Sequence, residues 1–295
     1  MDKVLKTYNL TKKYGKIQAL DNVSLEIERG NVYGILGPNG SGKTTFLSTI
    51  LDIIQPNTGL YDWFGKGTSY KLRKRIGALL EMPNFYSYLS AERNLKIAAD
   101  IKGVSYTDIE RVLKFVNLYD RKKSTYKTFS YGMKQRLAIA SALLGKPEVL
   151  ILDEPTNGLD PQGIYEIREL IYKASNEGIT IILASHVLDE VEKICSHAAI
   201  IKKGVLLANG RVDELIKEEK HIELKASDME ALHNAIKEFS NTIEIKRETD
   251  KFIVKVSAQT TTEDVNKYLF DKGICLTHLV NRKKNLEMQF LEITH

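Results

Sequence analysis

Cysteine, tryptophan and long apolar runs are scarce in this sequence of 295 residues, and the shortages narrow the possible classes of protein. The two cysteines, Cys195 and Cys275, share no short motif and give no disulfide framework, which favours a reducing compartment. The longest apolar runs, 149–152 and 179–184, are far shorter than the roughly 20 residues that span a bilayer. The amino terminus also lacks the apolar core of a signal peptide. We therefore predict a cytoplasmic chain that meets a membrane only through a partner.

The sequence also has only a small excess of positive over negative charge. Lys plus Arg number 43 and Asp plus Glu number 38, so the net charge is +5. This excess is too small to indicate a nucleic-acid partner, and no long tract of like charge supports one. A composition of 43% hydrophobic and 27% charged residues is that of an ordinary globular protein. A chain of this length needs neither a disulfide nor a metal to hold its core together.

Strand and helix patterns alternate over residues 1–220, as expected of an α/β layer fold. Three apolar runs lack the alternation of a half-exposed strand, which is typical of parallel strands covered on both faces: 149–152, 179–184 and 198–201. Between about 88 and 145 the pattern is helical, and Thr107 with Glu110 predicts a capping box there. We predict an α/β domain with an inserted helical subdomain.

The pattern changes after residue 220. From 221 to 295 it reads strand, helix, two strands, helix, strand, with capping boxes predicted at Ser227 with Glu230 and at Thr261 with Asp264. This order predicts a small ferredoxin-like α+β domain. No catalytic constellation stands out in it. A structural or regulatory appendage is the simpler interpretation, and an independent ligand site is the alternative.

Residues 37–44 match the complete phosphate-loop pattern and lie between an apolar strand and a helical run, a context that a chance glycine-rich turn would lack. Glycines let backbone N–H groups approach phosphate oxygens, and the helix N-terminus adds a positive dipole. Lys43 is expected to reach the β- and γ-phosphates, and the Thr44 hydroxyl to ligate Mg²⁺. The predicted nucleoside triphosphate site comprises Gly37, Pro38, Asn39, Gly40, Ser41, Gly42, Lys43, Thr44 and Thr45.

Two carboxylates follow the apolar run 149–152. In phosphate-loop enzymes an acid at this strand end holds Mg²⁺ directly or through water, which assigns Asp153 to the metal. Glu154 is placed to orient or deprotonate the water that attacks the γ-phosphate. An acidic pair at a strand end is otherwise more often a solvated turn, and the phosphate loop is what favours the catalytic interpretation.

With further motifs in a set order, residues 1–220 resemble the ATP-binding subunits of ABC transporters. The resemblance implies that Tyr14 stacks on adenine, the alternative being that its ring packs at a strand end. Residues 129–136, Phe-Ser-Tyr-Gly-Met-Lys-Gln-Arg, are similar to the family signature. The resemblance assigns Ser130 and Gly132 to the ATP held by a second subunit.

Two more positions carry the resemblance. Asp160, in the segment Gly-Leu-Asp, is similar to the turn that crosses the dimer interface. His186 resembles the switch histidine that contacts the γ-phosphate. A lone histidine is more often structural, but this one follows an apolar strand in the expected order.

Three departures from the family pattern stand out. Tyr131 replaces the first signature glycine and Met133 replaces its glutamine, while the serine and second glycine are kept. Glu81 stands where most of the family has glutamine, and the resemblance makes it a ligand of Mg²⁺ or of its water. A glutamate there, like the short tail, is similar to the bacitracin- and lantibiotic-resistance exporters.

In this family each ATP lies between the phosphate loop of one subunit and the signature of the other. A chain with one phosphate loop and one signature therefore cannot complete an ATP site by itself. The resemblance therefore implies a homodimer, or a pair with a close relative, around two ATP and Mg²⁺. It implies a membrane-associated ATPase that drives a separate multi-span permease for export, with peptides, drugs or lipids as possible cargo. The rivals are a soluble ABC-type ATPase acting on ribosomes or nucleic acid and a module that binds ATP without hydrolysing it. The cargo, the direction of transport and the role of the tail stay open.

Overall fold

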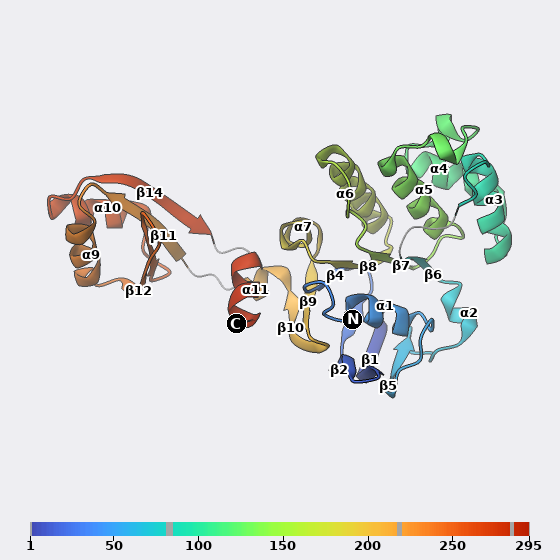
Figure 1. The fold of residues 1–295 in the computed structure, drawn as a ribbon, viewed down its shortest axis with the longest axis horizontal. Helices are drawn as coiled ribbons and strands as arrows, with labels where there is room; N and C mark the ends of the chain where they lie inside the picture. Colours follow the sequence, from blue (N-terminus) through green and yellow to red (C-terminus); the bar gives the residue numbers. More distant parts are fainter. Residues whose placement is uncertain (1, 81–84, 217–219, 284–285, 295) are drawn as a thin grey trace. The chain divides into compact units, whose positions relative to one another are not determined.

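The computed structural model describes residues 2–80, 85–216, 220–283 and 286–294 (Figure 1). The chain divides into two units, Met1–Val212 and Asp213–Ile293. Sequence patterns placed the change at about residue 220. In the described part of the chain, no helix is both long enough and apolar enough to cross a membrane.

A six-stranded sheet forms the centre of the first unit. Its order is β10-β9-β4-β8-β7-β6, and all neighbours are parallel except β10, which runs antiparallel to β9. The three unalternating apolar runs lie in this sheet, so the prediction of buried parallel strands is confirmed. The strands are β4 (Val32–Leu36), β6 (Ile76–Leu79), β7 (Val149–Asp153), β8 (Thr180–Ser185), β9 (His197–Lys202) and β10 (Val205–Arg211).

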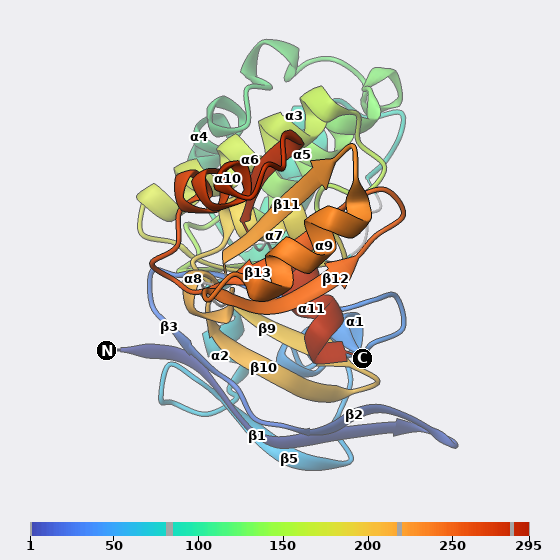
Figure 2. The same ribbon diagram turned by 90° about the vertical axis from the view of Figure 1, so that its left-hand side faces the viewer.

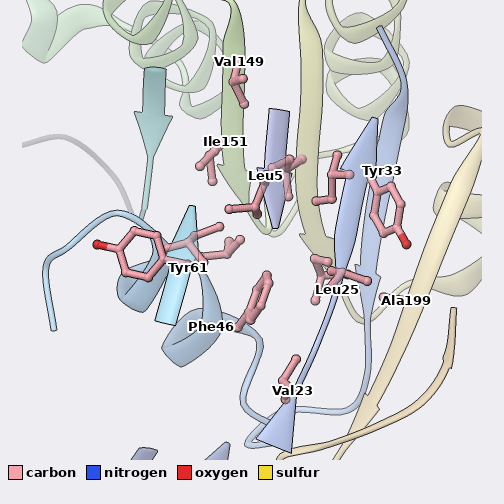
Figure 3. Close-up of a cluster of buried hydrophobic side chains, with 14 of the residues drawn as sticks. Leu5, Val23, Leu25, Tyr33, Phe46, Tyr61, Val149, Ile151 and Ala199 are labelled. Atoms are coloured by element: carbon pink, nitrogen blue, oxygen red, sulfur yellow. The ribbon is translucent and has the colours of Figure 1, made fainter. Parts of the chain in front are cut away.

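A second, antiparallel sheet packs with helix α1 (Lys43–Ile50) in the main core. Phe46 of α1 is completely buried, and Trp63 donates from Nε1 to the carbonyl of Ile50 at 2.8 Å. Figure 3 shows Phe46 among side chains of both sheets. This packing anchors the helix that begins at the phosphate loop. The strands are β1 (Lys3–Tyr14), β2 (Ile17–Val23), β3 (Glu26–Glu28) and β5 (Thr58–Trp63).

The predicted helical insertion lies between the paired strands β6 and β7, and Figure 1 draws it in green. Thr107 does not cap its helix as predicted. It is the first helical residue, and its N–H bonds to the Ser105 hydroxyl. The segments between β6 and β7 are α3 (Ala91–Lys102), α4 (Thr107–Phe115), η1 (Tyr119–Arg121), η2 (Tyr126–Thr128) and α5 (Tyr131–Leu143).

The remaining helices of the first unit border its sheet. Helices α6 (Pro161–Asn176) and α7 (Leu188–Ile194) both contact β8. Two short helices lie elsewhere in the chain, α2 (Tyr70–Arg73) before β6 and α8 (Val212–Leu215) where the first unit ends.

The second unit has the predicted ferredoxin-like order. Its antiparallel sheet runs β12-β13-β11-β14, so the first and third strands of the motif are central. Helices α9 and α10 bury their apolar faces against this sheet, and Figure 2 views the unit from the side on which α9 lies. The elements are β11 (Lys220–Ala226), α9 (Met229–Glu238), β12 (Thr242–Arg247), β13 (Phe252–Val256), α10 (Thr262–Asp271), β14 (Leu276–Lys283) and α11 (Leu286–Thr294).

The two capping predictions for this unit had different outcomes. Thr261 and Asp264 form the expected reciprocal box at α10. Ser227 does not cap α9, because the neighbouring Asp228 accepts from the N–H groups of Glu230 and Ala231. A carboxylate one residue later fills the same role, so the helix begins one residue later than the pattern indicated.

Candidate nucleotide site

The phosphate loop leaves the fully buried strand β4 and enters helix α1. Close packing requires glycine at two positions of this loop. A Cβ on Gly37 would lie 2.2 Å from the carbonyl oxygen of Ile201, and one on Gly42 would lie 2.3 Å from that of Ala19. Gly42 also has φ 111°, a conformation that side chains disfavour. A Cβ on Gly40 would meet no atom within 4 Å, so the loop is open at that point.

Lys43 is almost completely buried, at 5% exposed, beneath this loop. Its ammonium group donates to the carbonyls of Gly37 at 2.8 Å and Pro38 at 3.3 Å. The Ser41 hydroxyl is also buried and has no hydrogen-bond partner among the described residues. A buried cation and an unused donor inside a curved backbone fit the oxygens of a phosphate.

Two of the residues predicted to hold Mg²⁺ come from distant parts of the chain and lie in contact. Thr44, in the first turn of α1, donates its hydroxyl hydrogen to Oδ2 of Asp153 at 2.8 Å. A hydroxyl beside a carboxylate offers hard oxygen donors, and Mg²⁺ sites usually add only one or two carboxylates to waters and phosphates. The pair therefore fits Mg²⁺. The third predicted ligand, Glu81, lies outside the described residues.

Glu154 connects the other two predicted catalytic residues. Its Oε1 lies 3.3 Å from Nζ of Lys43, and its Oε2 lies 2.8 Å from Nδ1 of His186. Its backbone has φ 47°, a strained value for a residue other than glycine, and its N–H donates to the carbonyl of Ala184 in β8. The fold thus holds the carboxylate between an ammonium group and an imidazole.

Tyr14 ends strand β1, and its ring is 48% exposed, so it is not part of the buried core. The ammonium group of Lys12 lies 5.3 Å from the ring centroid. An exposed ring leaves a face on which a planar base could stack.

The signature segment forms the start of α5. Ser130 is the N-cap, and its hydroxyl oxygen accepts from the N–H of Met133 at 3.2 Å, which leaves the hydroxyl hydrogen to be donated elsewhere. Gly132 lies in the first turn, where N–H groups lack helical partners. Asp160 caps α6 by accepting from the N–H of Gly163 at 2.9 Å.

Sequence reasoning gave no role to Gln135 of α5. Its side chain is buried, and it donates to the carbonyl oxygen of Pro155, the residue after Glu154. The sequence offered one signal for such a role. Gln135 follows Tyr131 by four residues, which places both side chains on the same face of a helix. The bond itself joins segments that the sequence keeps apart.

Known proteins resemble this chain in both sequence and fold. Residues 20–157 match the family model described as ABC transporter. The bacitracin transport ATP-binding protein BcrA of Bacillus licheniformis is 38% identical over 299 residues, which cover 99% of this chain and 98% of that protein. The chain belongs to the ABC transporter family. It is an ATP-binding subunit, and the family's ATPase activity is coupled to transport.

Two further matches cover 71% and 72% of this chain. The lantibiotic transport ATP-binding protein SrtF of Streptococcus pyogenes is 41% identical over 210 residues, covering 71% of this chain and 92% of its own. Among solved structures, the ADP conformation of MJ1267, an ATP-binding cassette of an ABC transporter, matches with a TM-score of 0.68 and 25% identity. That match covers 72% of this chain and 93% of the cassette. The predicted resemblance to bacitracin and lantibiotic transport proteins is confirmed.

Proposed function

We propose that this chain is the ATP-hydrolysing subunit of an exporter, and that two subunits close around two ATP molecules to drive a separate membrane permease. One observation carries the catalytic part of the proposal. The Glu154 carboxylate lies between Lys43 and His186, beside the Thr44–Asp153 pair. This arrangement suits the attack of water on a γ-phosphate. It combines a carboxylate base with a cation, a histidine and a pair of oxygen ligands for Mg²⁺.

Each residue has a distinct role in this proposal. Backbone N–H groups of the loop and the Lys43 ammonium group hold the β- and γ-phosphates. Thr44 and Asp153 would hold Mg²⁺, together with Glu81. When bound, Mg²⁺ neutralises charge on the phosphate oxygens. Glu154 accepts the proton of the attacking water, and His186 fixes the carboxylate and contacts the γ-phosphate.

The contact between Lys43 and Glu154 suggests that ATP binding frees the catalytic carboxylate. The ammonium group lies against Oε1 of Glu154 and two loop carbonyls. An arriving triphosphate offers it stronger, charged acceptors. The carboxylate then exchanges its contact with Lys43 for one with the attacking water.

Pairing of two subunits completes the proposed site. A chain with one phosphate loop and one signature can give each ATP both halves only across an isologous interface. Ser130 and Gly132 of one subunit would contact the ATP held by the partner, and Tyr14 would stack on the adenine of its own ATP. Loss of the γ-phosphate would weaken the contacts from Ser130 and Gly132 across the interface and let the pair open.

The names of the relatives support a cargo class. BcrA and SrtF are described as transport proteins for bacitracin and for lantibiotics. We propose export of a peptide antibiotic or a similar amphipathic compound. The subunit would then lie at the inner face of the membrane, held there by its permease.

Glu154→Gln tests the proposed chemistry. The amide keeps the shape of the side chain but cannot accept the proton, so we expect normal ATP binding, a loss of turnover of about 100-fold or more, and a dimer stabilised by ATP. Nucleotide titration, phosphate release and gel filtration with and without ATP measure the three effects. Glu166→Gln, a change of the same kind on α6, is the control and should behave as wild type. Normal turnover in Glu154→Gln would remove Glu154 from the catalytic role.

Co-expression tests the transport part. The chain produced together with a candidate multi-span permease should protect a sensitive host from a peptide antibiotic, and Glu154→Gln should abolish that protection. A protective effect that survives the substitution would separate resistance from ATP hydrolysis.

A further inference from the structure

The turn between Glu154 and helix α6 is held from one side by helix α5. Gln135, 5% exposed, donates from Nε2 to the carbonyl oxygen of Pro155 at 2.8 Å. Because a carbonyl only accepts, this contact also fixes which end of the amide points toward the turn. Pro155 has no N–H of its own, so its carbonyl is the one backbone group that it can offer.

Tyr131 makes a second contact with the same turn, one helical turn before Gln135. Gly158 has φ 75°, and a Cβ there would lie 3.5 Å from Cε1 of Tyr131. The ring therefore lies against this glycine. Next to it, a Cβ on Gly132 would lie 3.7 Å from Cδ2 of Leu159. One face of α5 thus touches the turn near both of its ends.

A backbone hydrogen bond also joins the turn directly to Glu154. The N–H of Asn157 donates to the carbonyl of Glu154 at 3.2 Å, and that of Leu159 donates to the carbonyl of Thr156 at 3.3 Å. Since Glu154 has a strained backbone at φ 47°, its neighbours must hold it there. A shift of Pro155 or Gly158 would move the Glu154 carboxylate relative to Lys43 and His186.

We propose that Tyr131 and Gln135 are positioning residues that clamp the turn 155–160 and thereby place the Glu154 carboxylate for hydrolysis. The proposal rests on the proposed function, in which Glu154 is the base. It also gives a role to Tyr131, which stands where the family signature usually has glycine. Ser130 is the N-cap of α5, so the clamp joins the signature of a chain to the base of the same chain.

Gln135→Leu tests the hydrogen bond, because leucine fills a similar volume without a donor. We expect kcat for ATP to fall about 10- to 100-fold, with the KM for ATP changed less than about twofold. Tyr131→Gly removes the ring at an exposed site and should lower kcat in the same way. Tyr131→Phe is the matched control, since it keeps the ring whose Cε1 is the atom nearest Gly158, and it should keep wild-type kcat.

A double substitution tests whether Gln135 affects hydrolysis through Glu154 or by another route. If the clamp only places Glu154, adding Gln135→Leu to Glu154→Gln should lower the residual single-turnover rate less than about twofold. Multiplicative losses in the double variant, or a wild-type kcat in both Gln135→Leu and Tyr131→Gly, would overturn the clamp. Thermal unfolding accompanies each measurement, and Tyr131→Gly alone decides the question if Gln135→Leu fails to fold. Normal turnover in Glu154→Gln would refute the proposed function instead, a result separate from these.

Discussion

A carboxylate at the far end of strand β7 from the nucleotide site gives a quantitative test of the fold. Glu148 accepts from Nη2 of Arg75 at 2.7 Å and from Nη1 of Arg29 at 2.8 Å. Arg75 also lies over the Phe64 ring, with Cζ 3.7 Å from the centroid. The hydrogen bonds from Arg75, followed by those from Arg29, outweigh partial burial and lower the pKa of Glu148 from 4.5 to about 2. This cluster ties the starts of β4, β6 and β7 together.

The size of the effect follows from that pKa. A difference of about 2.5 pH units corresponds to about 3.4 kcal/mol between the two protonation states. The Glu148 side chain is 37% exposed, so solvent screening reduces the contribution to about 1–2 kcal/mol. We therefore expect Glu148→Gln to lower the free energy of unfolding by that amount at pH 7, which corresponds to a fall in Tm of about 3–6 °C.

The loss should depend on pH with a defined sign. The pKa of Glu148 is lower in the folded than in the unfolded chain, so its carboxylate stabilises the fold above pH 4.5. This stabilisation disappears as the pH falls toward about 2. The difference between wild type and Glu148→Gln should therefore shrink across this range.

Denaturant unfolding at pH 7 and at pH 3.5, without nucleotide, measures both quantities. Glu110→Gln is the control, because Glu110 forms an exposed pair with Lys114 on one face of α4. We expect this variant to unfold like wild type. Equal effects of the two substitutions, or a Glu148→Gln effect that stays constant between the two pH values, would refute the argument.

Three further predictions concern the nucleotide and the second unit. Lys43→Ala should remove most ATP affinity while the loop backbone stays in place, and unchanged affinity in a nucleotide titration would make the phosphate-loop assignment wrong. A 1–220 fragment retains the core of the first unit, so ATP at about 100 times its dissociation constant should stabilise it by about 2.7 kcal/mol. A folded fragment without that stabilisation would show that the tail belongs to the site. Glu81→Gln should change ATP hydrolysis modestly, because either side chain offers an oxygen to Mg²⁺, whereas Glu81→Ala should lower hydrolysis and uncouple transport. Wild-type hydrolysis and export in Glu81→Ala would leave Glu81 as a solvated strand end.

Several features could be predicted because they are local in the sequence. The loop 37–44 carries its chemistry within eight residues, and unalternating apolar runs such as 149–152 follow from burial on both faces. The ferredoxin-like order of the second unit followed from the succession of short patterns. Helix caps were less certain, because a neighbouring polar residue can replace the expected one. Asp228 did so for Ser227 at α9.

By itself, the sequence determined which side chains are available and in what order, and hence the phosphate loop, the sheet strands and the family. Only the tertiary structure decided which of them meet. Lys43 and Glu154 are more than a hundred residues apart in the chain, and the sheet brings them to 3.3 Å. The left-handed backbone of Glu154 and the bond from Gln135 to Pro155 were likewise not readable from the sequence. They depend on packing between segments distant in the chain, and sequence patterns report the preferences of neighbouring residues rather than such contacts.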